Sequence, residues 1–281
     1  MSTAVASVPE TLAATELTAA EIAAFQMRGF HLHGKVFSDA EVAELLGACE
    51  RVCNREYETG IEPDSRCWNP GDSELAVRKI DNGWKANRTV RKFATSERLG
   101  RIAAQLIGAP SIRLFHDQYL HKPARGGKVV TWHQDWAYWQ MIDQPRTVTC
   151  WIALDDVYAD SGPMMFLEGS HKLGLHSLPM GITGDDEQKP RLPDGLNLKE
   201  VPVIIKKGCV SFHHGLTLHG SAKNTGNTPR RALVAHVMSG ESRYRPSQPH
   251  ICERMMKLQA NCPQPGELLA GPQFPPLWPV E

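Results

Sequence analysis

The feature that most constrains the fold is a succession of short strand-like runs in the second half of the chain. After Pro110, stretches rich in β-branched and aromatic residues alternate with turn residues such as Gly126-Gly127, without helical patterns between them. Such strands form antiparallel sheets, and many of them together favour a barrel or a double-sheet jelly roll. The predicted strands cover residues 112–120, 128–132, 147–154, 164–166, 201–205, 209–213 and 231–238.

The first hundred residues have a mainly helical pattern instead. Thr18 is followed three residues later by Glu21, and this arrangement is a capping box that starts a helix. Ser38 and Glu41 repeat the pattern. A third helix is predicted where apolar residues recur at helical spacing up to Gly108. The predicted helices cover residues 19–28, 39–54 and 97–107.

We expect one mainly β domain over residues 1–281, with no linker inside it. A polar stretch interrupts the strands, and a loop of that length inside a compact domain is often a lid or a binding loop. The expected parts are a helical support over about 1–110, a jelly-roll core over about 111–240, a lid-like loop over about 172–200 and an irregular tail over 263–281, which packs through Phe274 and Trp278.

Composition and charge narrow the range of partners. Lys plus Arg and Asp plus Glu both number 31, so the net charge is zero and we expect neither nucleic acid nor a membrane as partner. There is no apolar run of about 18 residues, and residues 1–21 lack the features of a signal peptide. Seven scattered cysteines without a CxxC pair predict free thiols and a reducing, cytoplasmic location.

The segment Thr131-Trp132-His133-Gln134-Asp135-Trp136 contains the pattern H-x-D. On a strand, residues i and i+2 point to the same face, so His133 and Asp135 would offer an imidazole nitrogen and a carboxylate oxygen to one ion. Two ligands do not make a selective site, and a third must come from elsewhere in the chain. Two histidines and one carboxylate, with open positions left over, are typical of non-haem Fe(II) oxygenases.

A second segment, His219-Gly220-Ser221, precedes a turn and the predicted strand that starts near Arg230 and Arg231. A histidine before a turn and an arginine at the start of the next antiparallel strand can face one cavity. The planar guanidinium of arginine matches a carboxylate with two parallel hydrogen bonds. The segment therefore suits a dicarboxylate co-substrate. Because side chains alternate along a strand, one of the two arginines enters the barrel and the other faces outward.

Six motifs occur in order between residues 78 and 238. They are Lys122-Pro123, Trp132-His133-Gln134-Asp135, Gly162-Pro163-Met164, Gly169-Ser170-His171, His219-Gly220-Ser221 and Arg230. Together they resemble the signature of the phytanoyl-CoA dioxygenase (PhyH) family of Fe(II)/2-oxoglutarate-dependent oxygenases, which includes ectoine hydroxylases and secondary-metabolite hydroxylases. The resemblance implies a double-stranded β-helix, which is a cupin-like jelly roll.

The resemblance also implies the cofactors and the residues that hold them. Fe(II) would be bound by His133, Asp135 and His219. The family spacing puts Arg230 inside the barrel, where it would bind 2-oxoglutarate together with Ser221. Trp151 matches a position that lines the co-substrate pocket. Lys79 and Gln118 are further candidates for contacts with 2-oxoglutarate.

The implied reaction consumes 2-oxoglutarate and O2, releases succinate and CO2, and hydroxylates a small-molecule substrate. Related halogenases lack the carboxylate ligand, so the presence of Asp135 favours hydroxylation. Desaturation, ring formation and epoxidation use the same ligands and stay open.

The substrate candidates lie near the iron motif and on the first long predicted strand. Trp136, Tyr138 and Trp139 are either a packed aromatic cluster or an apolar substrate wall, and both are compatible. His116 shares a strand face with Gln118. His213, His214 and His171 are expected to pack or to support the site rather than to bind the metal.

The expected substrate is a small to medium-sized, mainly apolar metabolite from a biosynthetic pathway. An acyl-CoA is the alternative, and it would need a basic patch such as one formed by Lys122, Arg125 and Lys128. Two other classes of protein would have the same fold. One is a redox-neutral jelly-roll enzyme that uses zinc or manganese, and the other is a catalytically silent binding protein. Arg230 and Ser221 argue against the first of these, and the complete ligand triad argues against the second.

Overall fold

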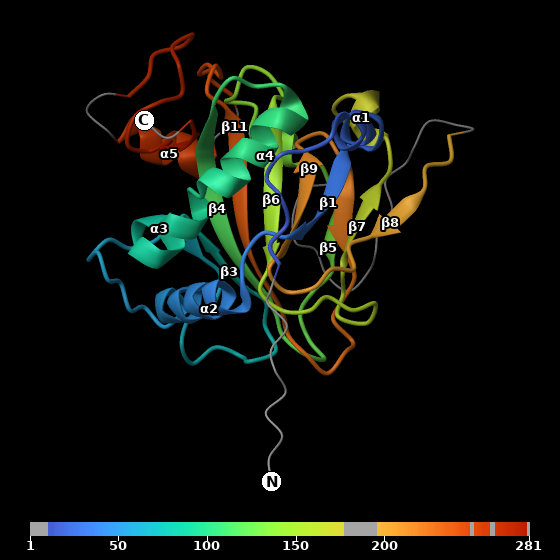
Figure 1. Ribbon diagram of the computed structural model, residues 1–281. Helices are drawn as coiled ribbons and strands as arrows, with labels where there is room; N and C mark the ends of the chain where they lie inside the picture. Colours follow the sequence, from blue (N-terminus) through green and yellow to red (C-terminus); the bar gives the residue numbers. More distant parts are fainter. Residues whose placement is uncertain (1–10, 177–195, 248–249, 259–261, 280–281) are drawn as a thin grey trace.

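Two antiparallel sheets form the core, and they confirm the jelly-roll prediction (Figure 1). The large sheet has the order β1 (Phe30–Lys35), β9 (Cys209–His214), β6 (Thr147–Ala153), β11 (Arg230–Ser239), β4 (Ile112–Lys122), β3 (Arg78–Asp81) and β2 (Ser65–Arg66), and β12 (Pro276–Trp278) pairs with β4. The small sheet has the order β5 (Val130–His133), β10 (His219–Ser221), β7 (Met164–Leu167) and β8 (Glu200–Pro202). This computed structural model describes residues 11–176, 196–247, 250–258 and 262–279.

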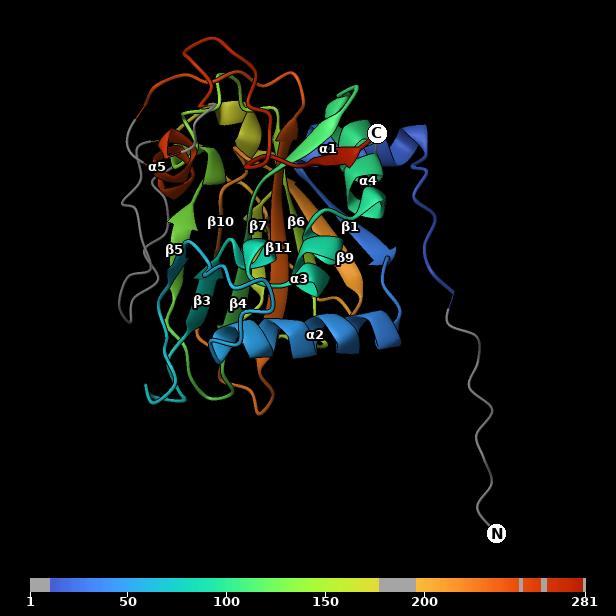
Figure 2. The same cartoon turned by 90° about the vertical axis from the view of Figure 1, so that its left-hand side faces the viewer.

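Helices cover the outer face of the large sheet. Figure 1 shows α4 in front of that sheet, with the small sheet behind, and the rotated view in Figure 2 shows α2 crossing below the strands. The α-helices are α1 (Ala19–Arg28), α2 (Asp39–Cys53), α3 (Arg88–Ala94), α4 (Glu97–Ile107) and α5 (Ile251–Lys257). Short 3-10 helices are η1 (Gly83–Lys85), η2 (Asp135–Ala137) and η3 (Ser170–Leu173).

The two predicted capping boxes are present and set the starts of α1 and α2. The part before residue 110 is less helical than expected, because β1, β2 and β3 add strands to the large sheet. Part of the C-terminal tail is also regular, since β12 pairs with β4. Phe274 is fully buried there, as expected. No helix among the described residues is long and apolar enough to cross a membrane.

Alternation along β6 and β11 separates the core into two layers. On β6, Val148, Cys150 and Ile152 pack outward against the helices, whereas Trp151 lies in the cluster between the sheets. On β11 the even-numbered residues, beginning with Arg230, face the interior, and the odd-numbered residues face the helices. This register places the polar residues of β4, β6, β9 and β11 in one cavity inside the barrel.

Candidate metal centre and adjoining cavity

Three potential ligands meet where the small sheet opens into the barrel. His133 ends β5, His219 begins β10, and the two residues are paired across the antiparallel ladder. Asp135 Oδ1 lies 3.7 Å from His133 Nε2 and 3.6 Å from His219 Nε2. The three ligand atoms lie within 4.8 Å of one another, which suits a single ion. Asp135 lies in η2 rather than on a strand, so the strand argument for H-x-D was wrong in detail: the chain turns directly after His133.

Both imidazoles are held with one nitrogen toward the centre. His133 Nδ1 lies 2.7 Å from the Thr131 carbonyl, and His219 Nδ1 lies 2.9 Å from the Thr217 carbonyl. A carbonyl oxygen only accepts, so both Nδ1 atoms carry the proton and both Nε2 atoms present a lone pair. Burial lowers the pKa of each imidazole to about 4, so both are neutral at pH 7. Their protonation state therefore suits metal binding without further proton loss.

Asp135 is held as firmly as the histidines. Its Oδ2 accepts hydrogen bonds from Thr149 Oγ1 at 2.5 Å and from His213 Nε2 at 3.0 Å, which leaves Oδ1 for a metal. Burial opposes ionisation, but His219 and the hydrogen bond from His213 hold the pKa of the Asp135 carboxyl well below its ordinary value. The carboxylate is therefore a permanent anion in the centre. His213 has the supporting position that the sequence predicted, whereas the part played by Thr149 was missed.

A cavity of about 250 Å³ adjoins the three ligands. It is lined by most of the site residues predicted from the sequence, namely Lys79, His116, Gln118, Tyr138, Trp139, Trp151, Ser221 and Arg230. Trp136 is the exception: it packs against the cluster that contains Met141 and Tyr244, and the Arg245 guanidinium lies 5.5 Å from its ring. Trp136 is therefore part of the packed aromatic cluster rather than of the cavity wall.

Arg230 is a buried cation that pairs with no carboxylate among the described residues. Its side chain lines the cavity with its guanidinium 5.6 Å from the Trp151 ring centre, and its Nε has no hydrogen-bond partner among the described residues. Burial lowers its pKa to about 10, so it stays charged at pH 7. A buried charge is stable only when it is paired. The cavity thus has a binding position for an anion, whereas Arg231 faces outward and pairs with Asp155 at 2.7 Å.

Ser221 lies beside this position and is oriented by a buried lysine. Lys122 Nζ donates to Ser221 Oγ at 2.9 Å and also to the Ala222 carbonyl. Because the serine oxygen accepts from Lys122, its own proton is free to be donated into the cavity. Lys122 is only 2% exposed. It therefore does not join Arg125 and Lys128 in a surface patch.

The remaining wall contains two imidazoles that the sequence did not single out, those of His236 and His250. His236 Nδ1 lies 2.9 Å from Thr149 Oγ1, and Thr149 gives its only proton to Asp135, so His236 Nδ1 must be the donor. The Nε2 of His236 is then a buried acceptor without a hydrogen-bond partner in the described part of the chain. Burial lowers the pKa of His236 to about 3, which keeps the ring neutral. His116 stacks on it at 4.4 Å between ring centres, and His250 also lines the cavity.

Gln134, between two of the ligands, fastens the chain that follows η3. Its Nε2 donates to the carbonyls of Gly174 and Leu216 at 2.8 Å, and its Oε1 accepts from the backbone N–H of His176 at 2.8 Å. The start of the loop expected to act as a lid therefore lies beside the metal centre. Residues 177–195 of that loop lie outside the described part of the chain.

Two histidines and a carboxylate on a jelly roll, next to a buried arginine and serine, define a class of protein, the Fe(II)/2-oxoglutarate-dependent oxygenases. The sequence model of the family described as Phytanoyl-CoA dioxygenase (PhyH) matches residues 25–232, and the chain belongs to this family. The resemblance noted in the sequence is thereby confirmed.

Relatives and solved structures agree with this assignment. Ectoine dioxygenase of Bordetella parapertussis is 28% identical over 255 residues, which cover 83% of this chain and 79% of that protein. Peroxisomal phytanoyl-CoA dioxygenase of Homo sapiens is 24% identical, covering 78% of this chain and 68% of that protein. The carbocyclase SnoK from nogalamycin biosynthesis has a TM-score of 0.75 at 25% identity and covers 95% of this chain and 99% of its own.

The epimerase SnoN, solved with Fe3+, alpha ketoglutarate and nogalamycin RO, has a TM-score of 0.71 at 26% identity and covers 92% of this chain and 97% of its own. The present chain is therefore a dioxygenase that depends on Fe(II) and 2-oxoglutarate.

Proposed function

We propose that this dioxygenase hydroxylates a small to medium-sized, mainly apolar metabolite that carries a hydrogen-bond donor. The observation that carries the proposal is the composition of the cavity beside the three ligands. Tyr138, Trp139 and Met164 give the cavity apolar lining, and the imidazole of His236, 4.7 Å from the Trp139 ring, offers an acceptor without a partner among the described residues. Apolar walls with a few polar anchors are typical of small-molecule sites. We further propose a reducing, cytoplasmic location, because all seven cysteines are free.

In this proposal His133, Asp135 and His219 hold Fe(II), and Arg230 with Ser221 holds the remote carboxylate of 2-oxoglutarate. Trp151, Lys79 and Gln118, which also line the cavity, would contact the co-substrate. Fe(II), 2-oxoglutarate and O2 together supply the oxidising power for an unactivated C–H bond, which protein side chains lack, with succinate and CO2 as products.

The protein's own contribution is positioning. Thr149 and His213 fix the Asp135 carboxylate, and the buried guanidinium of Arg230 sets the direction of the dicarboxylate by paired hydrogen bonds. On the substrate side, a hydroxyl or amide N–H that donates to His236 Nε2 would satisfy a buried acceptor, whose desolvation otherwise costs about 1–3 kcal/mol. A purely hydrocarbon substrate would leave this acceptor unpaired.

The acyl-CoA alternative has less support. Lys122 is buried and engaged with Ser221, so it adds nothing to a surface site for the phosphates of coenzyme A. A redox-neutral metalloenzyme would have no use for the buried Arg230. Ring closure with the same ligands is a second candidate outcome, favoured by the similarity in fold and sequence to the carbocyclase SnoK.

The test is a screen of succinate formation with the iron-loaded protein. Free terpenoid, polyketide and amino-acid-derived alcohols or phenols would be compared with their O-methyl ethers and with acyl-CoA thioesters. We expect coupled hydroxylation of a free compound and turnover of its methyl ether that is lower by about 10-fold or more, the equivalent of one hydrogen bond. Strong coupled turnover of a CoA thioester alone would overturn the proposal.

Trp139 and Trp136 offer a matched pair of variants for the same screen. Trp139→Leu changes the cavity wall and should alter KM and the order of preferred compounds. Trp136→Leu, outside the cavity, should leave that order unchanged. Equal effects on substrate preference would contradict the assignment of the wall.

A further inference from the structure

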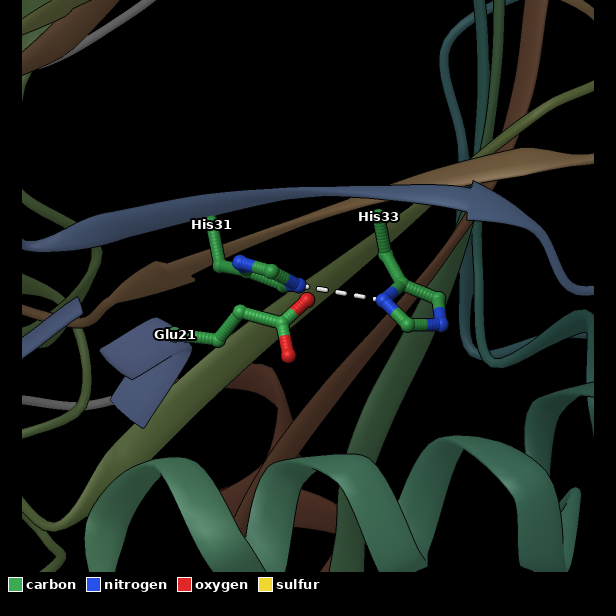
Figure 3. A group of neighbouring side chains, drawn as sticks. All are labelled: Glu21, His31 and His33. Atoms are coloured by element: carbon green, nitrogen blue, oxygen red, sulfur yellow. Dashed lines mark hydrogen bonds between the residues drawn. The ribbon is translucent and has the colours of Figure 1, made fainter. Parts of the chain in front are cut away.

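A second group of potential metal ligands lies away from the iron centre. Glu21 on α1 and His31 and His33 on β1 bring three ligand atoms within 4.8 Å of one another, and Figure 3 shows the three side chains converging. Among the described residues, this group and the His133, Asp135 and His219 triad are the two groups with such geometry.

The second group lies on the opposite face of the large sheet from the iron centre. In the pairing of β1 with β9, His31 lies opposite Phe212, whereas its neighbour Phe30 lies opposite His213. Phe212 belongs to the cluster under the helices, and His213 contacts Asp135 inside the barrel. Because paired residues point to the same side of a sheet, His31 and His33 face the helical layer.

Two of the three ligands are already oriented by other hydrogen bonds. His33 Nε2 donates to the Ala14 carbonyl at 3.0 Å, so its Nδ1 presents a lone pair. The Glu21 Oε2 atom accepts from the backbone N–H and the hydroxyl of Thr18 at 2.8 and 2.7 Å, which leaves Oε1 for another partner. Hydrogen bonds from a ligand to groups that do not bind the ion fix the orientation of the ligands in protein metal sites.

A single proton links the two histidines. His31 Nε2 lies 3.0 Å from His33 Nδ1, and since His33 Nδ1 is the acceptor, the proton belongs to His31 Nε2 (Figure 3). Burial lowers the pKa of both imidazoles, so both are neutral at pH 7. A change of tautomer at His31, from Nε2–H to Nδ1–H, is then enough to present two nitrogen lone pairs beside a carboxylate.

We propose that Glu21, His31 and His33 form a second divalent-metal site, which binds Zn2+ and is distinct from the iron centre. Two imidazoles and one carboxylate are a ligand set that Zn2+ binds well, and solvent supplies the fourth position because Glu21 and His31 are partly exposed. The ion would join α1 to the edge strand β1. Oxygen-seeking cations such as Mg2+ are disfavoured by the two nitrogen ligands.

The test counts Zn2+ equivalents on tag-free, metal-stripped full-length protein, in competition with a chromogenic chelator. We expect two equivalents for the native chain and one for His219→Ala, in which the iron centre is disabled. In the His219→Ala background, Glu21→Gln should weaken the remaining equivalent by at least about 10-fold, since loss of an outer contact alone costs 10–100-fold. Glutamine is also accepted at this position of a capping box, so α1 should stay intact.

Glu16→Gln in the same background is the control, because Glu16 is a nearby carboxylate that pairs with Arg101 instead. It should retain the second equivalent. As an independent readout, long-range 1H–15N spectra of the histidine rings should show His31 change from the Nε2–H to the Nδ1–H tautomer when Zn2+ is added. Three results would each overturn the proposal: binding of one equivalent by the native chain, no tautomer change at His31, or equal Zn2+ affinity in Glu21→Gln and Glu16→Gln. His31 and His33 would then be a hydrogen-bonded pair without a metal.

Discussion

Replacement of Arg230 by methionine should change stability and co-substrate affinity in opposite directions. In the absence of 2-oxoglutarate, burial lowers the pKa of Arg230 from its ordinary value to about 10. At pH 7 the guanidinium is charged in both the folded and the unfolded chain, so the whole pKa difference between the two states lowers the free energy of unfolding. A pKa difference of about 2.5 corresponds to about 3 kcal/mol. Arg230→Met removes this cost and keeps much of the side-chain volume, so the metal-bound protein without 2-oxoglutarate should be more stable by up to about 3 kcal/mol.

The same variant should lose affinity for 2-oxoglutarate. Removal of one partner of a buried, hydrogen-bonded charge pair costs about 2–5 kcal/mol, which is roughly a 30- to 4000-fold increase in Kd. Urea unfolding at pH 7 measures the first effect, and anaerobic calorimetric titration of the metal-loaded protein with 2-oxoglutarate measures the second.

Arg231→Met is the matched control. Arg231 pairs with Asp155 and Glu50 at 2.7 Å on the outer side of β11. Loss of these partly exposed pairs should cost about 1 kcal/mol of stability and leave the affinity for 2-oxoglutarate unchanged. If Arg231→Met impaired binding and Arg230→Met did not, the register of β11 would be wrong by one residue. If neither variant affected binding, the buried arginine would not be the carboxylate anchor.

Three further predictions concern the same centre and one buried carboxyl group. His133→Ala and His219→Ala should each lose tight Fe(II) binding, measured by equilibrium dialysis, and all 2-oxoglutarate turnover, while circular dichroism stays native. Thr149→Val, which removes one hydrogen bond from Asp135 without a change of shape, should weaken Fe(II) binding about 10- to 100-fold; unchanged affinity would contradict the supporting role of the hydroxyl. Burial raises the pKa of Asp117 to about 7, so ionisation destabilises the fold as the pH rises from about 4 to 7. Asp117→Asn should therefore be more stable than the native chain by up to about 4 kcal/mol in urea at pH 8 but not at pH 4, because the pKa lies about 3.2 units above its ordinary value of 3.8.

Features set by short-range sequence patterns were predictable. The capping boxes at Thr18 and Ser38 act over three residues, so they fixed the starts of α1 and α2 without knowledge of the rest of the fold. The two-residue period of β11 likewise separated Arg230 from Arg231 once the strand was known. The three candidate ligands were found because their motifs are specific in combination.

Contacts between distant parts of the chain were not predictable in the same way. Lys122 reaches Ser221, and Thr149 and His236 support Asp135, only because β4, β6, β10 and β11 meet around one cavity. Trp136 and Trp139 also look equivalent in the sequence. Both pack in the same cluster, but after the 3-10 turn at residues 135–137 only Trp139 also lines the cavity, and neither helical nor strand periodicity applies to such a turn.

Short elements were missed for a related reason. The strand β10 has only three residues, and its sequence, His219-Gly220-Ser221, has no strand preference of its own. It exists because β5 and β7 provide hydrogen-bonding partners on both sides. The proximity of Glu21 to His31 and His33 similarly depends on how α1 packs against β1, which no local pattern specifies.

The most direct test of the central claim is the conversion of 2-oxoglutarate to succinate and CO2 by the purified chain. Fe(II), 2-oxoglutarate labelled at the carboxyl group that is released, and O2 are supplied together, and each is omitted in turn. We predict label release that requires all three, rises with the true substrate, and disappears in His219→Ala and Asp135→Ala although both variants stay folded. Label release at the native rate in either variant, or release by the native chain without Fe(II), would contradict the assignment of His133, Asp135 and His219 as the metal centre.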